Sequence, residues 1–372
     1  MTLAAAERLD DAALLETADP SGILRQVASA AAQVRAGARA ATEADLGEVL
    51  AGGRPRAIVV TGMGGSGIAG EVLAAVVGQG CPVQVTTVHD YRLPGWVGAA
   101  DLVVAVSCSG ATEETLSAAG EAARRGCRLL GVGSPDSPLA ALAEQARAGF
   151  IGVEPLGMPR SMLWGLSVPL VVSAARLGIL DVPEQAYEAA AAELERVAHL
   201  CRPDSESFVN PAKTLALDLS GTLPMIWGTS PLAGVAAVRF ANQLHENGKY
   251  PAIAGVLPEA NHNQVVVFDG PFVAAPGAVG EDQEPPVPLR LVLLRDTHEH
   301  PQVARRREES ARIAAERGIE VTELGAAGDQ PLERLASLVQ LIDYASVYLA
   351  IANGIDPAPI AAIQELKARS QR

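Results

Sequence analysis

The stretch AIVVTGMGGSGIAGEVLAAVV, residues 57–77, contains three local signals in direct succession. Its first five residues are apolar and rich in β-branched side chains, which is typical of a buried parallel strand. Residues 62–67, GMGGSG, form a glycine-rich turn, and an Ala- and Val-rich helix is expected to follow as far as residue 77. A strand that leads into a helix through such a turn predicts an α/β fold with a parallel sheet.

The same alternation recurs along the chain. Further strands are expected at residues 83–88, 102–106, 127–132, 150–153, 224–227, 289–294 and 320–324. Helices are expected after residue 112 and at residues 232–247, 301–317 and 333–353. Because residues 58–77 and 225–244 follow one plan, the sequence predicts two related subdomains, each a mainly parallel sheet flanked by helices.

These patterns divide the chain into five parts. We expect an N-terminal helical segment (1–54), a first subdomain (55–158), a helical connection (159–222), a second subdomain (223–355) and a C-terminal helix (356–372). The apolar run 162–175 is too short to span a bilayer comfortably and predicts a buried helix. Residues 271–288 contain five prolines and an acidic run, which predicts a mobile surface loop.

Composition excludes several classes of protein. With 49% apolar residues among 372 the chain has material for a large core. Its net charge of -14, without a basic stripe, argues against a nucleic-acid partner. Four cysteines lack metal-ligand spacing, and the N-terminus lacks the pattern of a signal peptide. We therefore expect reduced thiols, no membrane partner and a cytoplasmic location.

The glycine turn at 62–67 is compatible with two ligands. It matches G-x-G-x-x-G, and Asp90 after the second expected strand could serve as the acidic partner of a dinucleotide site. The same turn, placed before a helix, lets backbone N–H groups approach any anion. This loop alone leaves both interpretations open.

A second loop, SCSGAT at residues 107–112, also follows a strand and begins a helix. Its hydroxyls and free N–H groups could surround a phosphate. Ser and Thr at a helix start are also ordinary N-cap residues. Two such loops at adjacent strands favour phosphate binding over either capping alone or a dinucleotide site.

The strand–Ser-x-Ser-x-x-Thr–helix unit resembles the sugar isomerase (SIS) domain. A longer set of motifs occurs in order: GMGGSGIAG at 62–70, SCSGATEETL at 107–116, Pro159-Arg160, HENGK at 245–249 and PEANHN at 258–263. Together they resemble the bifunctional phosphoglucose/phosphomannose isomerase family over about residues 55–370. The resemblance implies two SIS-type subdomains and a metal-free, cofactor-free aldose–ketose isomerase.

The resemblance also implies roles for individual residues. Ser107, Ser109 and Thr112 would hold the substrate phosphate. Gly64, Gly65 and Ser66 would border the sugar. The catalytic set would be Glu246 as the base between C1 and C2, Arg160 at the enediolate oxygen, His262 for ring opening and Lys367 as the family's terminal lysine. In the family this histidine comes from the second subunit of a homodimer.

These roles suit the chemistry of the reaction. Removing a proton beside a carbonyl needs a carboxylate near the carbon and a cation near the developing oxyanion. A histidine suits proton transfer during ring opening near neutral pH. His89, His298 and His300 match no motif. The expected reaction interconverts fructose 6-phosphate with glucose 6-phosphate and/or mannose 6-phosphate through a cis-enediol, with the preferred sugar left open.

Two other functions fit parts of the sequence. A non-catalytic sugar-phosphate sensor would use the same SIS loops, but it is commonly fused to a DNA-binding module, and no basic recognition helix is evident here. A dinucleotide-dependent enzyme would use the glycine loop and Asp90. The presence of Glu246 and His262 favours the isomerase.

Overall fold

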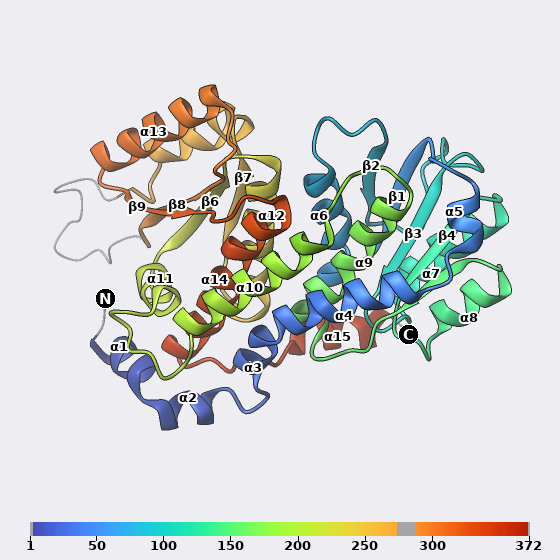
Figure 1. The fold of residues 1–372 in the computed structure, drawn as a ribbon. Coiled ribbons are helices and arrows are strands. Elements are labelled where there is room, and N and C mark those ends of the chain that lie inside the picture. The colour runs from blue at the N-terminus through green and yellow to red at the C-terminus, as the bar shows by residue number, and fades with distance from the viewer. Residues whose placement is uncertain (1–2, 274–286, 371–372) are drawn as a thin grey trace. The chain divides into compact units, whose positions relative to one another are not determined.

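The computed structural model describes residues 3–273 and 287–370. It divides into two compact units, each built around one parallel sheet (Figure 1). Unit A comprises Ala28–Glu195 and Gly328–Ala336, and unit B comprises Met1–Val27, Arg196–Ala327 and Ser337–Arg372. Most of the loop expected at 271–288 lies outside the described residues, and the five subdomain boundaries stay a prediction.

The sheet of unit A has the strand order β2-β1-β3-β4-β5, with every pair parallel. Its central strands carry apolar side chains on both faces and are fully buried, as the continuous apolar runs in the sequence predicted. The strands are β1 (Ala57–Thr61), β2 (Gln84–Val88), β3 (Leu102–Ser107), β4 (Arg128–Gly133) and β5 (Gly149–Gly152).

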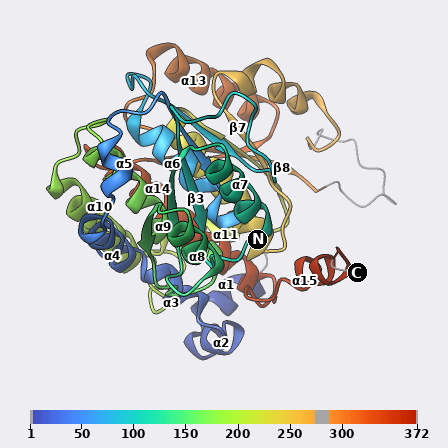
Figure 2. The same ribbon diagram turned by 90° about the vertical axis from the view of Figure 1, so that its right-hand side faces the viewer.

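Helices pack against both faces of this sheet. Val103 and Leu129 of one face lie in a core with Ala118 and Ala122 of α7 (Glu113–Arg124). Both α7 and β3 can be followed in Figure 2, and α8 (Pro138–Gln145) packs against β4. The remaining helices of this unit are α4 (Ala30–Glu43), α5 (Gly47–Ala51), η1 (Gly64–Ser66), α6 (Ile68–Val77), η2 (Pro159–Ser161) and α9 (Leu163–Arg176).

Unit B repeats the topology. Its sheet has the order β7-β6-β8-β9, again parallel throughout. Reading β6 as the counterpart of β1 gives the same order as the first four strands of unit A, so the predicted fold class is confirmed. The strands are β6 (Leu223–Gly228), β7 (Ile253–Val256), β8 (Leu289–Arg295) and β9 (Glu320–Gly325).

One hydrophobic cluster of unit B lies on the face of its sheet that packs against α13 (Pro301–Glu316). It joins Trp227 and Leu291 of the strands to Val303 and Ala314 of that helix. Other elements of the unit are α1 (Leu3–Asp10), α2 (Ala12–Ala18), α3 (Ile23–Ala28), α11 (Pro211–Leu219), α12 (Pro231–Glu246), η3 (Glu259–His262), η4 (Gln264–Asp269) and α15 (Ala361–Ser370). Three helices contribute residues to both units: α3, whose last residue Ala28 lies in unit A, α10 (Glu184–Leu200) and α14 (Pro331–Ala352).

No separate element was predicted for α8, α11, β7, η3 or η4, although α11 lies within the helical connection predicted at 159–222. Helices α8 and α11 begin at residues that the sequence does mark, because Ser137 and Asn210 cap them and proline follows each cap. Strand β7 is half-exposed at the edge of its sheet and has four residues, too few to show a periodic pattern.

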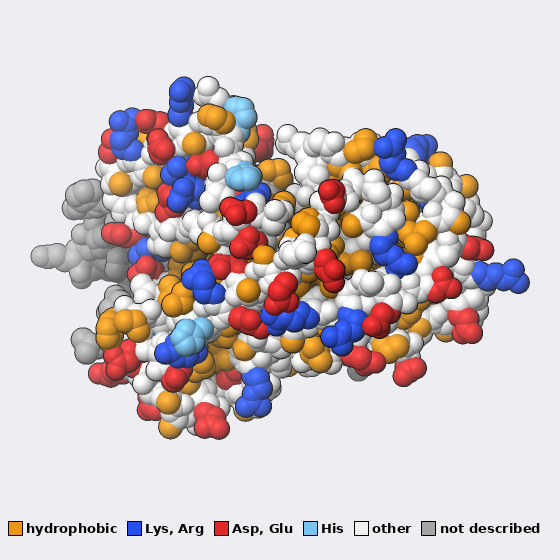
Figure 3. Space-filling view, viewed as in Figure 1, with side chains coloured by type: hydrophobic (Ala, Val, Ile, Leu, Met, Phe, Trp, Pro, Cys, Tyr) orange, Lys and Arg blue, Asp and Glu red, His pale blue; other side chains and the backbone are white. Residues whose placement is uncertain are grey.

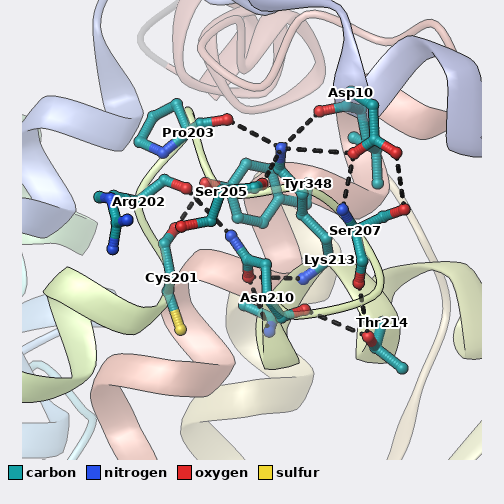
Figure 4. A network of polar contacts seen from close by, with 12 residues as sticks. Asp10, Cys201, Arg202, Pro203, Ser205, Ser207, Asn210, Lys213, Thr214 and Tyr348 are labelled. Carbon is teal, nitrogen blue, oxygen red and sulfur yellow. Dashed lines mark hydrogen bonds and ion pairs between the residues drawn. The ribbon is translucent and has the colours of Figure 1, made fainter.

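A buried lysine ties the N-terminal segment to the rest of unit B (Figure 4). The ammonium of Lys213 donates to the carbonyls of Leu9 at 2.5 Å, Pro203 at 2.8 Å and Ser205 at 2.7 Å. It also lies 3.7 Å from a carboxylate oxygen of Asp10. Burying an ammonium is costly unless its donors are satisfied, and here backbone oxygens satisfy them.

One helix among the described residues, α14, is long and apolar enough by length and composition alone to cross a membrane. In the structure 94% of that apolar window is buried inside the protein, as in the core helix of a soluble domain.

The run predicted as a buried helix at 162–175 is confirmed as α9. On the face drawn in Figure 3, acidic and basic side chains lie interspersed.

Candidate functional site

The glycine loop and the serine loop follow two neighbouring strands of unit A, β1 and β3. From β1 the chain runs to β2 on one side, whereas β3, β4 and β5 lie on the other. Ligands of open α/β sheets bind at such a switch point, beyond the carboxyl ends of the strands. The topology therefore places both predicted loops where a ligand site is expected.

Most glycines of the first loop are required by close packing. A Cβ at Gly62 would lie 2.9 Å from the carbonyl oxygen of Val106, and one at Gly65 would lie 2.9 Å from that of Pro159. Gly64 differs, because it has a φ of +53° and no atom within 4 Å of a built Cβ. At Gly64, therefore, no neighbouring atom covers the loop backbone on the side where a Cβ would lie.

Ser66 joins the two loops. Its hydroxyl oxygen accepts a hydrogen bond of 3.1 Å from the backbone N–H of Cys108, and its side chain is buried. The sequence placed Ser66 beside the sugar, and that role stays a prediction. The structure adds a different function, which is to hold the serine loop against the glycine loop.

Two side-chain hydroxyls of the serine loop, those of Ser107 and Thr112, are in contact. Ser107 Oγ lies 2.9 Å from Thr112 Oγ1, and Ser107 is 1% exposed. Ser109 is exposed, and its Oγ accepts from the N–H of Ala111 at 3.3 Å. Thr112 is the N-cap of α7 but makes no side-chain capping bond, so its hydroxyl does not satisfy the N–H groups of the first turn.

The turn of this loop depends on Gly110. It has a φ of +62°, and a Cβ built there would lie 2.0 Å from Ser137 Oγ. Ser137 caps α8, and the N–H of Leu139 donates to the Gly110 carbonyl at 2.9 Å. The start of α8 therefore supports the serine loop from behind.

Arg160 lies on η2, directly against the glycine loop. A Cβ at Gly65 would lie 3.1 Å from Arg160 Cα, and the arginine is 3% exposed. Arg160 therefore places a positively charged side chain beside the glycine loop of an acidic protein. Unit A thus brings together seven of the predicted site residues: Gly64, Gly65, Ser66, Ser107, Ser109, Thr112 and Arg160.

Glu246 is the last residue of α12 in unit B and is half-buried. The helix is fixed by the buried ion pair of Arg239 with Asp343 of α14, at 2.5 Å. Directly after the helix, Asn247 Nδ2 donates to Ser346 Oγ at 2.9 Å. Lys249 Nζ then donates to the carbonyl of Glu246 at 3.0 Å. The end of α12 is therefore held rigidly, which a positioned base requires.

His262 lies on η3, after the cis peptide Leu257–Pro258. Its side chain is exposed and makes no hydrogen bond with any residue in the described ranges. The following Gln264 accepts from Trp227 Nε1 at 2.6 Å, so it fixes the PEANHN segment to β6. The histidine is thus presented on a segment that is itself well anchored.

Lys367 lies on α15, where no side chain is buried. It has no hydrogen-bonding or ionic partner among residues 3–273 and 287–370. The three predicted catalytic residues of unit B, Glu246, His262 and Lys367, therefore sit on three separate segments.

Unit B has a switch point of its own, between β6 and β8, but a carboxylate already occupies it. The hydroxyl of Ser230 donates to Asp296 at 2.7 Å and accepts from the N–H of Ala233, the first turn of α12. Thr229 Oγ1 accepts from the N–H of Asp296 at 2.9 Å. The carboxylate thus lies beside the first turn of α12 through Ser230, whose Oγ takes the N–H of Ala233.

Sequence reasoning missed three residues around these loops: His89, Ser137 and Asp296. Strand register would have found His89, because Thr61 pairs with Val88 and the histidine is therefore level with Gly62. Ser137 carried the ordinary signature of an N-cap. Asp296 follows a predicted strand. Nothing in the sequence around it indicated that it would contact Ser230 and Thr229.

No group of three His, Cys, Asp or Glu side chains suited to a metal ion occurs in the described part of the chain. All four cysteines are free thiols. Burial raises the pKa of Cys108 in the serine loop and raises the pKa of Cys201 to about 12. These two thiols are therefore poor nucleophiles near neutral pH.

Two family models match the chain. The SIS domain matches residues 54–150, and the bacterial phospho-glucose isomerase C-terminal SIS domain matches residues 208–369. A bifunctional phosphoglucose/phosphomannose isomerase of Caldicellulosiruptor bescii is 32% identical over 83% of this chain and 88% of its own. The chain belongs to the bifunctional phosphoglucose/phosphomannose isomerase family. The resemblance read from the sequence motifs is thereby confirmed, as is the prediction of a sugar-phosphate isomerase.

Other comparisons agree with this family. The bifunctional phosphoglucose/phosphomannose isomerase of Aquifex aeolicus is 31% identical over 84% of this chain and 89% of its own. The crystal structure of a hypothetical protein from Thermus thermophilus has a TM-score of 0.69 and 18% identity, over 99% of this chain and 93% of that one. That structure supports the fold alone.

Proposed function

We propose that this protein interconverts fructose 6-phosphate with glucose 6-phosphate and/or mannose 6-phosphate through a cis-enediol intermediate. The observation that carries the proposal is the pair of joined loops in unit A. Ser107 and Thr112 are already in contact there, and Arg160 is buried beside Gly65. The chain's membership of an isomerase family supports the same reaction.

The phosphate would bind to the serine loop. The hydroxyls of Ser107, Ser109 and Thr112 would donate to its oxygens, aided by the N–H groups that begin α7. Gly64 would let the sugar approach the backbone, since nothing lies within 4 Å of its built Cβ. Charge-assisted hydrogen bonds of this kind supply both affinity and orientation.

Glu246 would move the proton. Starting from the open-chain ketose, the carboxylate takes the proton from C1 and the oxygen on C2 takes one from solvent, which gives the enediol. The proton on Glu246 exchanges with solvent in a share of the turnovers. Glu246 then protonates C2 as the hydroxyl on C1 releases its proton to solvent, which gives the aldose. Arg160 would stabilise the negative charge that develops on oxygen, and Lys367 would add positive charge. Delivery to one face of C2 gives glucose 6-phosphate and delivery to the other gives mannose 6-phosphate.

Before this step, His262 would open the ring by moving a proton between the C1 or C2 hydroxyl and the ring oxygen. Its exposed side chain has no partner within the described chain, which supports donation to the site of a second copy. A homodimer with two such shared sites is the arrangement we propose.

Deuterium exchange tests this reaction directly. The purified protein is incubated with fructose 6-phosphate in deuterated water without any added cofactor, and the products are followed by NMR. We expect deuterium at C2 of glucose 6-phosphate, mannose 6-phosphate or both. Tight binding without exchange would instead identify a sugar-phosphate sensor, and a requirement for nicotinamide would identify a dinucleotide enzyme.

A further inference from the structure

His89 contacts the glycine loop from outside the predicted site. It directly follows β2, and its Nδ1 lies 2.8 Å from the carbonyl oxygen of Gly62, the first residue of the loop. Its Nε2 lies 3.0 Å from Oε1 of Glu71, in the first turn of α6. The imidazole thus connects the start of the loop to the helix that the loop leads into.

Both partners of this histidine are hydrogen-bond acceptors. A carbonyl oxygen cannot donate, and an ionised carboxylate cannot donate either. A neutral imidazole carries one N–H and can satisfy only one of them, whereas an imidazolium satisfies both. The two contacts taken together therefore suit a doubly protonated ring.

The ring also packs against the loop. A Cβ at Gly67 would lie 2.7 Å from Cε1 of His89 and 2.9 Å from the Gly62 carbonyl oxygen. The other oxygen of Glu71, Oε2, is buried without a hydrogen-bond partner. Oε1 is thus the Glu71 oxygen that contacts the imidazole, and the ring fills the space beside Gly67.

We propose that His89 is a positioning residue whose imidazolium holds the glycine loop in its binding conformation, so that deprotonation of His89 weakens the binding of the sugar phosphate. This inference rests on the proposed function of the two loops. The added positive charge beside the switch point would also favour an anionic substrate.

The charges around His89 agree with a retained proton. Glu71 faces it from α6, Asp90 follows it in the chain, and residues 62–67 and 84–88 of the neighbouring loop and strand carry no titratable side chain. Partial burial acts to lower the pKa of His89. The hydrogen bonds to Gly62 and Glu71 outweigh it and leave the pKa raised above its ordinary value.

The test combines an NMR titration with steady-state kinetics. In the wild-type protein the His89 imidazole should titrate above its ordinary pKa, and Glu71→Gln should lower that pKa. The KM for fructose 6-phosphate should rise as pH passes the His89 pKa, with kcat nearly unchanged. In His89→Ala the KM should be raised on the order of tenfold at low pH and should lose this pH dependence.

Two conservative variants separate the hydrogen bond from the charge. His89→Asn places an N–H donor near the position of Nδ1 and should restore part of the affinity without pH dependence, whereas His89→Gln mimics Nε2 and should restore less. His199→Ala, which removes an exposed histidine of α10 that contacts Arg202, is the matched control and should leave KM unchanged.

The outcomes distinguish this inference from the proposed function. Normal turnover with an unchanged KM profile in His89→Ala would overturn the role of His89 and leave the isomerase intact, as would a His89 pKa that Glu71→Gln does not move. If the wild-type protein shows no turnover, calorimetric binding of fructose 6-phosphate replaces KM. Weaker binding by His89→Ala would then support the inference, and equal binding would overturn it.

Discussion

At the scale of single residues, Glu246 is distinguished from other glutamates by its setting. It ends a helix that is fixed to α14 by the buried Arg239–Asp343 pair, and it is half-buried. A glutamate at the end of an exposed helix is ordinarily a solvated charge. Here the rigid backbone would let the carboxylate meet a substrate carbon reproducibly.

We predict that Glu246→Gln abolishes isomerisation while substrate binding persists. The amide keeps the size of the side chain but cannot accept the proton, so kcat should fall by about 10²–10⁴. Calorimetry with fructose 6-phosphate measures the retained binding. Glu316→Gln, at the exposed end of α13, is the control and should keep full activity. Rates in Glu246→Gln close to those of the wild type would refute the assignment of the base.

Thr112 offers a test of the phosphate loop. Thr112→Val removes the hydroxyl that contacts Ser107 while keeping the shape of the side chain. We expect KM to rise on the order of tenfold with a smaller change in kcat, since one hydrogen bond to a charged group is lost. Thr115→Val is the matched control, because the buried Thr115 hydroxyl has no hydrogen-bond partner among the described residues. Equal KM values in the two variants would argue against a phosphate site at this loop.

At the scale of elements, the two switch points differ although their sheets share one topology. In unit A the serine loop is backed by α8 and leaves hydroxyls at the carboxyl edge. In unit B the carboxylate of Asp296 engages Ser230, and Thr229 accepts from the Asp296 backbone. A second anion there would be repelled by the first. The two switch points therefore differ in that a carboxylate of the chain itself lies at the one in unit B.

Gly110, the glycine of the serine loop, should be sensitive to substitution. Gly110→Ala must place a Cβ 2.0 Å from Ser137 Oγ at a positive φ, so we expect the free energy of unfolding to fall by about 3 kcal/mol and KM to rise. Gly126→Ala has a similar φ of +69° but no atom within 4 Å. It should therefore lose only about 1 kcal/mol and leave KM unchanged. Urea unfolding measures both, and equal losses would show that the contact with Ser137 is unimportant.

At the scale of the whole molecule, the first helices, up to Val27, belong to unit B rather than forming a free extension. Lys213 binds the carbonyl of Leu9 together with two carbonyls of residues 203–205, about two hundred residues away. Asp10 also accepts from the N–H of Ser207 at 2.7 Å. These polar contacts join residues 9–10 to residues 203–213, which are far away in the sequence.

Lys213→Met should weaken these contacts. The apolar side chain leaves three carbonyls without their donor, so we expect the free energy of unfolding to fall by about 3 kcal/mol. Limited proteolysis should then cut first within residues 1–27. An unfolding free energy within about 1 kcal/mol of the wild type would show that the carbonyls find other donors.

The proposed homodimer predicts complementation between inactive variants. A heterodimer of Glu246→Gln and His262→Asn chains would contain one site with both functional residues, if each site takes its histidine from the other subunit. Random exchange of subunits should then restore about a quarter of the wild-type activity. With both residues supplied by one chain, every site would be damaged and mixing would restore nothing.

Much of this protein was determined by local sequence. Apolar runs bounded by Gly, Ser and Pro gave nearly all strands to within one or two residues, because a strand buried on both faces must be continuously apolar. The ordered motifs identified the isomerase family, since chemistry constrains residue type and spacing. The short elements α8, α11 and β7 were not predicted separately because their burial depends on neighbours that are distant in sequence.

Tertiary structure decided which residues of the motifs serve packing and which remain open. A Cβ built at Gly62, Gly65 or Gly67 would lie under 3.0 Å from backbone or side-chain atoms, whereas one at Gly64 would not, although all four look alike in the sequence. The bonds of Ser66 to Cys108 and of His89 to Gly62 join strands that are paired through space. The sequence determines the chemistry of each side chain. Folding determines which residues that side chain contacts, because contacts at a switch point join residues that follow different strands.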